Sequence, residues 1–194
     1  DLFQVHVPPK TEKEFADVEK VFNDIKSEGK ARYCGISVGI RYEQGKEIIK
    51  RKLADSIQIY FSLIDQKPLK ELLPLAKKNN IGVIVAEPLA QGLLTNKYKI
   101  GHIFPKNDLR SNSYSKQLLE KKLKRVKQFN FLINKNRTLN QTALAYILSK
   151  EEVSTCIPGA KSTEQLISNT TSSKIELNQS ELKKIEEIQE EWRD

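Results

Sequence analysis

Methionine is absent from the 194 residues, and cysteine and histidine occur only twice each. Cys34 and Cys156 each lie in an apolar, strand-like run without metal-ligand spacing, which favours buried free thiols over a disulfide or a metal site. No apolar run approaches the roughly 20 residues that a membrane span needs. No basic start followed by an apolar stretch indicates a signal peptide. These absences predict a cytoplasmic protein with no metal and no membrane partner.

The start of the chain is also unusual. At ordinary frequencies a chain of this length would hold about four methionines. Asp1 is followed at once by a strand-like run over residues 2–5, with no initiator and no lead-in. We therefore expect the sequence to be the carboxyl-terminal fragment of a longer protein.

The net charge is +8, from 33 basic and 25 acidic residues. The basic residues are dispersed over helix-like segments such as 50–52 and 121–125, and no aromatic platform is interleaved with them. Solvated helix faces explain this pattern better than a nucleic-acid surface does. A cofactor that carries phosphate would also suit the sign of the charge.

Strand-like and helix-like segments alternate along the chain, which predicts right-handed βαβ units and a parallel sheet. The expected strands are residues 2–5, 32–38, 57–63, 82–86 and 154–157. The expected helices are residues 11–28, 43–53, 68–80, 114–133, a segment from 138, 164–169 and 178–192, and capping boxes begin the first and the last of them. Five such strands fit a small doubly wound sheet or most of an eight-stranded barrel. No Gly-x-Gly-x-x-Gly follows any strand, which argues against a Rossmann-type dinucleotide site.

The strand at residues 82–86 is followed by the most informative segment, residues 87–98, which read EPLAQGLLTNKY. Ligands in α/β proteins bind outside the carboxyl ends of the strands. The segment resembles the cofactor-clasping loop of the aldo-keto reductase family, Pro-Leu-Ala-x-Gly-Leu-Leu-(Thr/Ser)-x-Lys-Tyr. Four further stretches resemble the family in the correct order: DLFQVHVP at 1–8, EGKARYCGIS at 28–37, IQIYFSL at 57–63 and IPGAKSTEQLISN at 157–169.

The resemblance covers the whole chain and aligns it with the family's barrel from the fourth strand onward. It implies an α/β fold, a (β/α)8 TIM barrel truncated to its last five strands and helices. Residues 1–194 would then be the carboxyl-terminal part of a single barrel domain that lacks three βα units. The missing amino-terminal segment would be a necessary partner, because five strands cannot close a barrel.

The resemblance further implies an NADPH-dependent oxidoreductase that transfers a hydride between the nicotinamide cofactor and a small aldehyde or ketone. His6 stands where the family has its catalytic histidine, a hydrogen-bond donor beside the substrate oxygen. The other tetrad members, Asp, Tyr and Lys, precede this strand in the family, so we expect the fragment alone to be inactive. The alternative is a non-catalytic, NADP(H)-binding regulatory relative, as some channel-associated members are.

The cofactor-binding residues that the resemblance implies fall into three groups. Ser37 and Gln58 would hold the nicotinamide carboxamide, although Val38 replaces the family's asparagine. The loop would fold over the pyrophosphate through Pro88, Leu89, Gly92, Leu94 and Lys97. The adenosine end would be held by Gly159, Lys161, Gln165 and Asn169, with Lys161 at a helix start that suits a 2′-phosphate.

Three residues near these motifs need separate comment. Asn96 replaces a common family glycine and tolerates the same left-handed backbone. Glu87 replaces a residue that is usually neutral, and the sequence offers no explanation for a carboxylate there. Arg110, in a later loop motif, could assist substrate or phosphate binding, but a salt bridge within the loop is the simpler interpretation.

Overall fold

The computed structural model describes residues 1–192, and these residues form two compact units. The first comprises Asp1–Phe61, Lys67–Ala86 and Glu151–Ile157. The second comprises Ser62–Gln66, Glu87–Lys150 and the chain from Pro158 onward. Each unit has its own packing.

The first unit is built on a five-stranded parallel sheet in the order β1-β2-β3-β4-β5, so each strand pairs with the next one in sequence. The strands are β1 (Leu2–Val5), β2 (Tyr33–Gly39), β3 (Ser56–Tyr60), β4 (Gly82–Ala86) and β5 (Thr155–Cys156). The predicted α/β class with a parallel sheet is confirmed. β3 ends three residues earlier than expected, because Ser62 and Asp65 pair in a tight antiparallel bridge beyond it.

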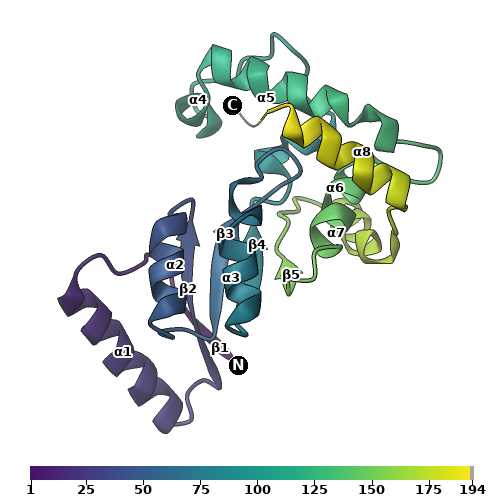
Figure 1. The fold of residues 1–194 in the computed structure, drawn as a ribbon. Helices are drawn as coiled ribbons and strands as arrows, with labels where there is room; N and C mark the ends of the chain where they lie inside the picture. The colour runs from purple at the N-terminus through teal and green to yellow at the C-terminus, as the bar shows by residue number, and fades with distance from the viewer. Residues whose placement is uncertain (193–194) are drawn as a thin grey trace. The chain divides into compact units, whose positions relative to one another are not determined.

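Helices accompany the strands in the first unit (Figure 1). They are α1 (Glu12–Ser27), α2 (Tyr42–Lys50), the 3₁₀ turn η1 (Lys67–Leu69) and α3 (Leu72–Lys78). The predicted capping box of α1 is present: Thr11 accepts from the Glu14 backbone N–H, and the Glu14 carboxylate accepts from the Thr11 backbone N–H. Such a cap contributes about 1 kcal/mol by satisfying donors that a helix start leaves unpaired.

The two sides of this sheet differ in chemistry. One side carries large apolar residues that pack under the helices: the Phe3 ring meets Phe22 of α1 edge-on at 6.3 Å, and Val38 lies beside Gly45 of α2. Its fully buried members include Cys34, Ile36, Val38, Ile57, Ile59, Val83 and Val85. Successive side chains of a strand point to opposite faces, so the alternate positions form a second side with small and polar residues.

The second unit is helical apart from its loops. Its elements are the 3₁₀ segment η2 (Ala90–Thr95), α4 (Arg110–Ser113), α5 (Lys116–Gln128), η3 (Asn130–Leu132), α6 (Leu139–Leu148), α7 (Thr163–Thr171), η4 (Ser172–Lys174) and α8 (Gln179–Glu190). The helix predicted over 114–133 is confirmed only in part, because α5 is shorter at both ends. Ser115 is an extended N-cap that accepts from the Leu118 backbone N–H, and the helix ends at Gln128 before a separate 3₁₀ turn.

Helix α6 forms the centre of this unit, with seven of its ten residues buried. Its Tyr146 hydroxyl contacts the side-chain oxygens of Gln66 at 3.1 Å and Gln189 at 3.2 Å. Helices α5 and α8 run side by side in Figure 1, and Trp192 Nε1 donates to Gln128 Oε1 at 2.9 Å. Within residues 1–192 no helix is both long enough and apolar enough to cross a membrane.

A largely buried ion pair ties the start of α8 to the loop before α6. Arg137 and Glu181 are 13% and 15% exposed, and the guanidinium also donates to the Leu132 carbonyl at 3.0 Å. Glu181 closes the predicted capping box of α8 by accepting from the Asn178 backbone N–H at 3.0 Å. Burial alone would raise the pKa of Glu181, but the Arg137 and Asn178 hydrogen bonds outweigh it and lower the pKa.

This arrangement predicts that Glu181→Gln lowers the free energy of unfolding by an amount that depends on pH. A folded-state pKa below the unfolded value contributes stability that is complete above about pH 4.3 and is lost as pH falls through the folded pKa. The variant exchanges a charge-assisted bond for a neutral one, so we expect a loss of about 1 kcal/mol at pH 7. Urea unfolding should show the difference shrinking toward pH 3. Glu186→Gln, at an exposed position of the same helix, is the matched control, and a pH-independent difference would contradict the prediction.

Candidate functional site

The predicted site residues are divided between the two units. His6, Ser37 and Gln58 belong to the first unit, whereas the loop after β4 and the segment before α7 belong to the second. His6 follows the last residue of β1 and is exposed. An imidazole at a strand's carboxyl end is available to a ligand, which is what the predicted role requires.

Ser37 and Gln58 lie on the same polar side of the sheet and are in contact. They are register partners on β2 and β3, and Gln58 Nε2 donates to Ser37 Oγ at 3.1 Å. The two side chains that the resemblance assigns to one carboxamide therefore lie close together. Sequence reasoning missed a third member: Gln4 of β1 donates from Nε2 to Gln58 Oε1 at 2.9 Å. The sequence did contain a signal for Gln4. It lies two residues before His6, and residues two apart along a strand share a face of the sheet.

Val38 points the other way. Val38 is fully buried and lies against Gly45 of α2. A Cβ added to Gly45 would be 3.4 Å from Val38 Cγ2, so the two residues are in close contact. The residue that departs from the family pattern therefore contributes to the apolar core under the helices. An amide at this position would need a buried partner.

The loop after β4 has an unusual backbone. Glu87, Ala90 and Gln91 have positive φ values of 53°, 49° and 55°, and Gly92 has φ 90°. Glu87 explains part of this turn, because its carboxylate accepts from the Gln91 backbone N–H at 3.1 Å. Its side chain is therefore a structural element of the loop, which the sequence did not reveal. Residues held in such conformations persist where surrounding contacts fix them, and they concentrate at functional sites.

The remaining loop residues differ in accessibility. Pro88 is buried, Leu89 is half-buried and Lys97 is exposed. Leu94 is 0% exposed and η2 packs against α5 and α6, so Leu94 anchors the loop in this structure. Asn96 has φ 59°, which confirms the left-handed backbone expected there.

Arg110 holds the far end of the same loop. Its guanidinium donates to the Gln91 carbonyl at 3.1 Å, to the Tyr98 hydroxyl at 2.7 Å and to the Asp108 carboxylate at 2.9 and 2.6 Å. It also lies over the Phe104 ring, 4.4 Å from the centroid. The side-chain hydrogen bond from Arg110 holds the pKa of Asp108 well below its usual range. The interpretation of Arg110 as a loop salt bridge is confirmed.

Tyr114 stacks near this cluster, with its ring 6.1 Å from Phe104. Burial, followed by the nearby Glu87 carboxylate, raises the pKa of Tyr114 to about 12. The hydroxyl therefore keeps its proton at neutral pH and is a poor proton donor there.

The segment before α7 is folded back on the helix start. Gln165 Oε1 accepts from the Lys161 backbone N–H at 2.8 Å, and Asn169 Nδ2 donates to the Gly159 carbonyl at 3.4 Å. Ser162 caps the helix by accepting from the Gln165 backbone N–H. Gly159 is open, with nothing within 4 Å of an added Cβ, and Lys161 is exposed. The first N–H groups of a helix lack partners within the helix, so this region suits an anion.

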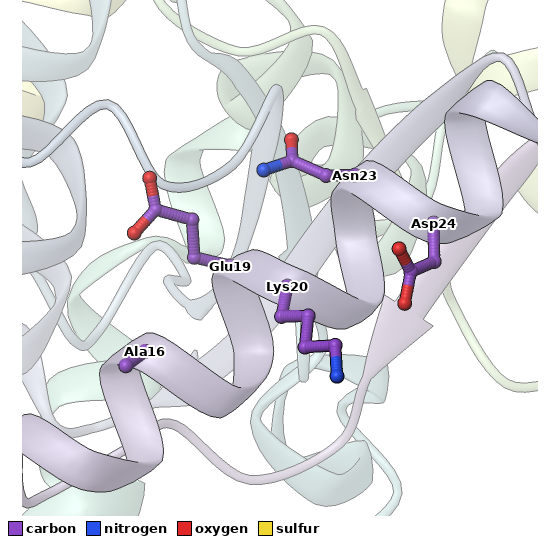
Figure 2. A pocket seen from close by; sticks show the side chains of 5 residues that line it. All are labelled: Ala16, Glu19, Lys20, Asn23 and Asp24. Carbon is purple, nitrogen blue, oxygen red and sulfur yellow. The ribbon is translucent and has the colours of Figure 1, made fainter.

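A pocket on the surface of α1 is a weaker candidate for a functional site than these positions. Its lining residues all come from that helix: Ala16, Glu19, Lys20, Asn23 and Asp24. Figure 2 shows Glu19 and Asn23 extending to one side of the helix and Lys20 and Asp24 to the other, so their polar ends do not converge. Among residues 1–192 no group of three or more His, Cys, Asp or Glu side chains could hold a metal ion.

The Arg110 cluster predicts how the loop responds to Arg110→Lys. Lysine keeps the charge but loses the planar fork and the stacking on Phe104. We expect amide hydrogens over residues 92–108 to exchange about three- to tenfold faster. Hydrogen exchange followed by mass spectrometry measures this. Arg32→Lys is the matched control, because Arg32 also pairs with an aspartate, Asp1, but is 71% exposed. Equal exchange rates in both variants would contradict the prediction.

Comparison with known proteins identifies the family of the chain. The model of the family described as "Aldo/keto reductase family" matches residues 1–190. The chain is 30% identical over 196 residues to the NADH-specific methylglyoxal reductase of Escherichia coli, and covers 59% of that protein with 98% of its own length. It is also 30% identical over 183 residues to an aldo-keto reductase of Schizosaccharomyces pombe named with NADP(+), covering 52% of it with 88% of its own length.

A solved structure gives the same result for the fold. The glycerol dehydrogenase of Gluconobacter oxydans superposes with a TM-score of 0.80 at 29% identity, over 97% of this chain and 57% of the dehydrogenase. The chain thus spans somewhat more than half the length of the proteins it matches. It belongs to the aldo/keto reductase family.

Proposed function

We propose that the chain is the carboxyl-terminal, cofactor-binding portion of an NADPH-dependent oxidoreductase that reduces a small aldehyde or ketone. The observation that carries this proposal is the contact between Ser37 and Gln58 at 3.1 Å on neighbouring strands. It is supported by family membership over residues 1–190.

The donors and acceptors present fit such a cofactor. The Ser37 hydroxyl and the second N–H of Gln58 are still available, and a primary carboxamide needs both donors and acceptors. In the second unit, exposed Lys161 at the start of α7 suits a phosphate group. Gly92, with φ 90°, leaves the loop backbone open to a close approach.

The cofactor, when bound, would supply the hydride. Ser37 and Gln58 would orient its carboxamide, and the loop residues 88–97 would cover its pyrophosphate. His6 would donate a hydrogen bond to the substrate oxygen as negative charge develops there. The proton would come from a tyrosine outside residues 1–194.

The barrel is proposed to be completed by preceding βα units. Among residues 1–192, β1 is an edge strand, since it pairs only with β2 in the sheet order. Its Leu2 and Phe3 are 41% and 42% exposed. An open edge with apolar side chains is a template for a further strand. The partner proposed for this edge is the parallel strand of a preceding βα unit.

The proposed preference for NADPH over NADH predicts the effect of Lys161→Ala. The 2′-phosphate adds nearly two negative charges that NADH lacks, and one charge-assisted contact contributes roughly 1.5–3 kcal/mol. We expect NADPH binding to weaken about ten- to a hundredfold, with NADH binding almost unchanged, in calorimetric titrations of the 194-residue chain.

The control is Lys174→Ala, at an exposed lysine in the 3₁₀ turn after α7. Equal weakening of both cofactors by Lys161→Ala, or of neither, would show that Lys161 does not read the 2′-phosphate. Tighter binding of NADH than of NADPH by the unchanged chain would overturn the proposed cofactor preference.

The proposed function also predicts that the 194-residue chain binds cofactor without turning over. We propose that the tyrosine, lysine and aspartate of the family's tetrad lie outside residues 1–194, in which case no positioned acid supplies the proton. NADPH oxidation with an aromatic aldehyde is the measurement. Saturable turnover that disappears in His6→Ala would contradict the prediction, because it would require an acid within the chain.

A further inference from the structure

We infer that Gln4 is a positioning residue that fixes which way the Gln58 amide faces, and thereby the orientation in which a nicotinamide carboxamide is held. This inference deepens the proposed function and rests on it. It starts from the bond between Gln4 Nε2 and Gln58 Oε1, 2.9 Å long, which joins β1 to β3.

These two strands are not neighbours, because β2 lies between them. Strands separated by one other strand are about 9.5 Å apart. Gln4 can span this gap because its register partner on β2 is Gly35. A Cβ added to Gly35 would lie 2.4 Å from Ser56 Oγ and 3.4 Å from Gln4 Oε1. The missing side chain on β2 is therefore the opening through which Gln4 reaches Gln58.

The direction of the bond settles the orientation of the amide. With Oε1 of Gln58 accepting from Gln4, Nε2 must point the other way, where it donates to Ser37 Oγ. The Ser37 hydroxyl is compatible with either orientation, because it can donate or accept, so the orientation present follows from Gln4 donating through Nε2. Gln4 thus selects one of the two amide orientations, and the remaining N–H of Gln58 and the O–H of Ser37 face a ligand as donors.

Two variants at this position separate orientation from mere packing. In Gln4→Glu the new carboxylate only accepts, so it draws Nε2 of Gln58 toward itself and reverses the amide. In Gln4→Leu the amide loses its partner and is free to adopt either orientation. We expect NADP⁺ binding by the 194-residue chain to weaken about three- to tenfold in Gln4→Leu and more in Gln4→Glu.

The decisive comparison uses 2′-phospho-ADP-ribose, which has the same adenosine and phosphates but no nicotinamide. Its affinity should stay within about twofold in both variants. The Gln58 side-chain amide signals in ¹⁵N–¹H spectra should move in both variants. Gln117→Glu, at an exposed position of α5, adds the same charge and should change neither measurement.

The outcomes distinguish the inference from the proposed function. Equal weakening of both ligands would show that Gln4 only supports the fold and would overturn the inference, as would unchanged NADP⁺ binding in Gln4→Glu. Either result would leave the proposed function standing if the unchanged chain binds NADP⁺. Absence of NADP⁺ binding by the unchanged chain would overturn both.

Discussion

The alternation of side chains along the parallel strands is the constraint on which the first unit depends. Ile36, Val38, Ile57 and Ile59 are all fully buried, and together they fix which side of the sheet the helices cover. The intervening positions are then left for small and polar residues. A shift of one residue in register would exchange the two sides completely. Core packing and the display of polar groups are therefore two results of one pattern.

In the second unit the corresponding constraint lies in the loop after β4. Leu93 and Leu94 are fully buried and anchor η2 to the helices, whereas the backbone on both sides adopts conformations that most residues avoid. Arg110 and Glu87 hold these conformations from opposite ends, the first through the Gln91 carbonyl and the second through the Gln91 N–H. A loop fixed in this way presents its backbone to a ligand with little ordering left to complete.

Much of the fold could be predicted from the sequence, because hydrophobic period and capping are local signals. The five strands and the capping boxes at Thr11 and Asn178 follow from neighbouring residues alone. The end of α5 at Gln128 could not be seen, since apolar residues at helical spacing, Val126, Phe129 and Ile133, continue across it. The candidate site shows the same division: motifs located Ser37 and Gln58, but the contact with Gln4 depends on pairing between distant strands.

The replacement at Val38 illustrates why a departure from a motif needs a structural test. Its side chain faces helix α2, where Gly45 leaves room for a branched apolar residue. Burial of a valine there contributes about 1.5–3 kcal/mol, whereas an unpaired amide would cost a comparable amount. Position 38 takes no part in the polar side of the sheet. The hydroxyl on that side belongs to Ser37, and the two amides belong to Gln58 and Gln4, on three different strands. Position 38 is therefore a core position in this chain, and the hydrogen-bonded group of Gln4, Ser37 and Gln58 forms without it.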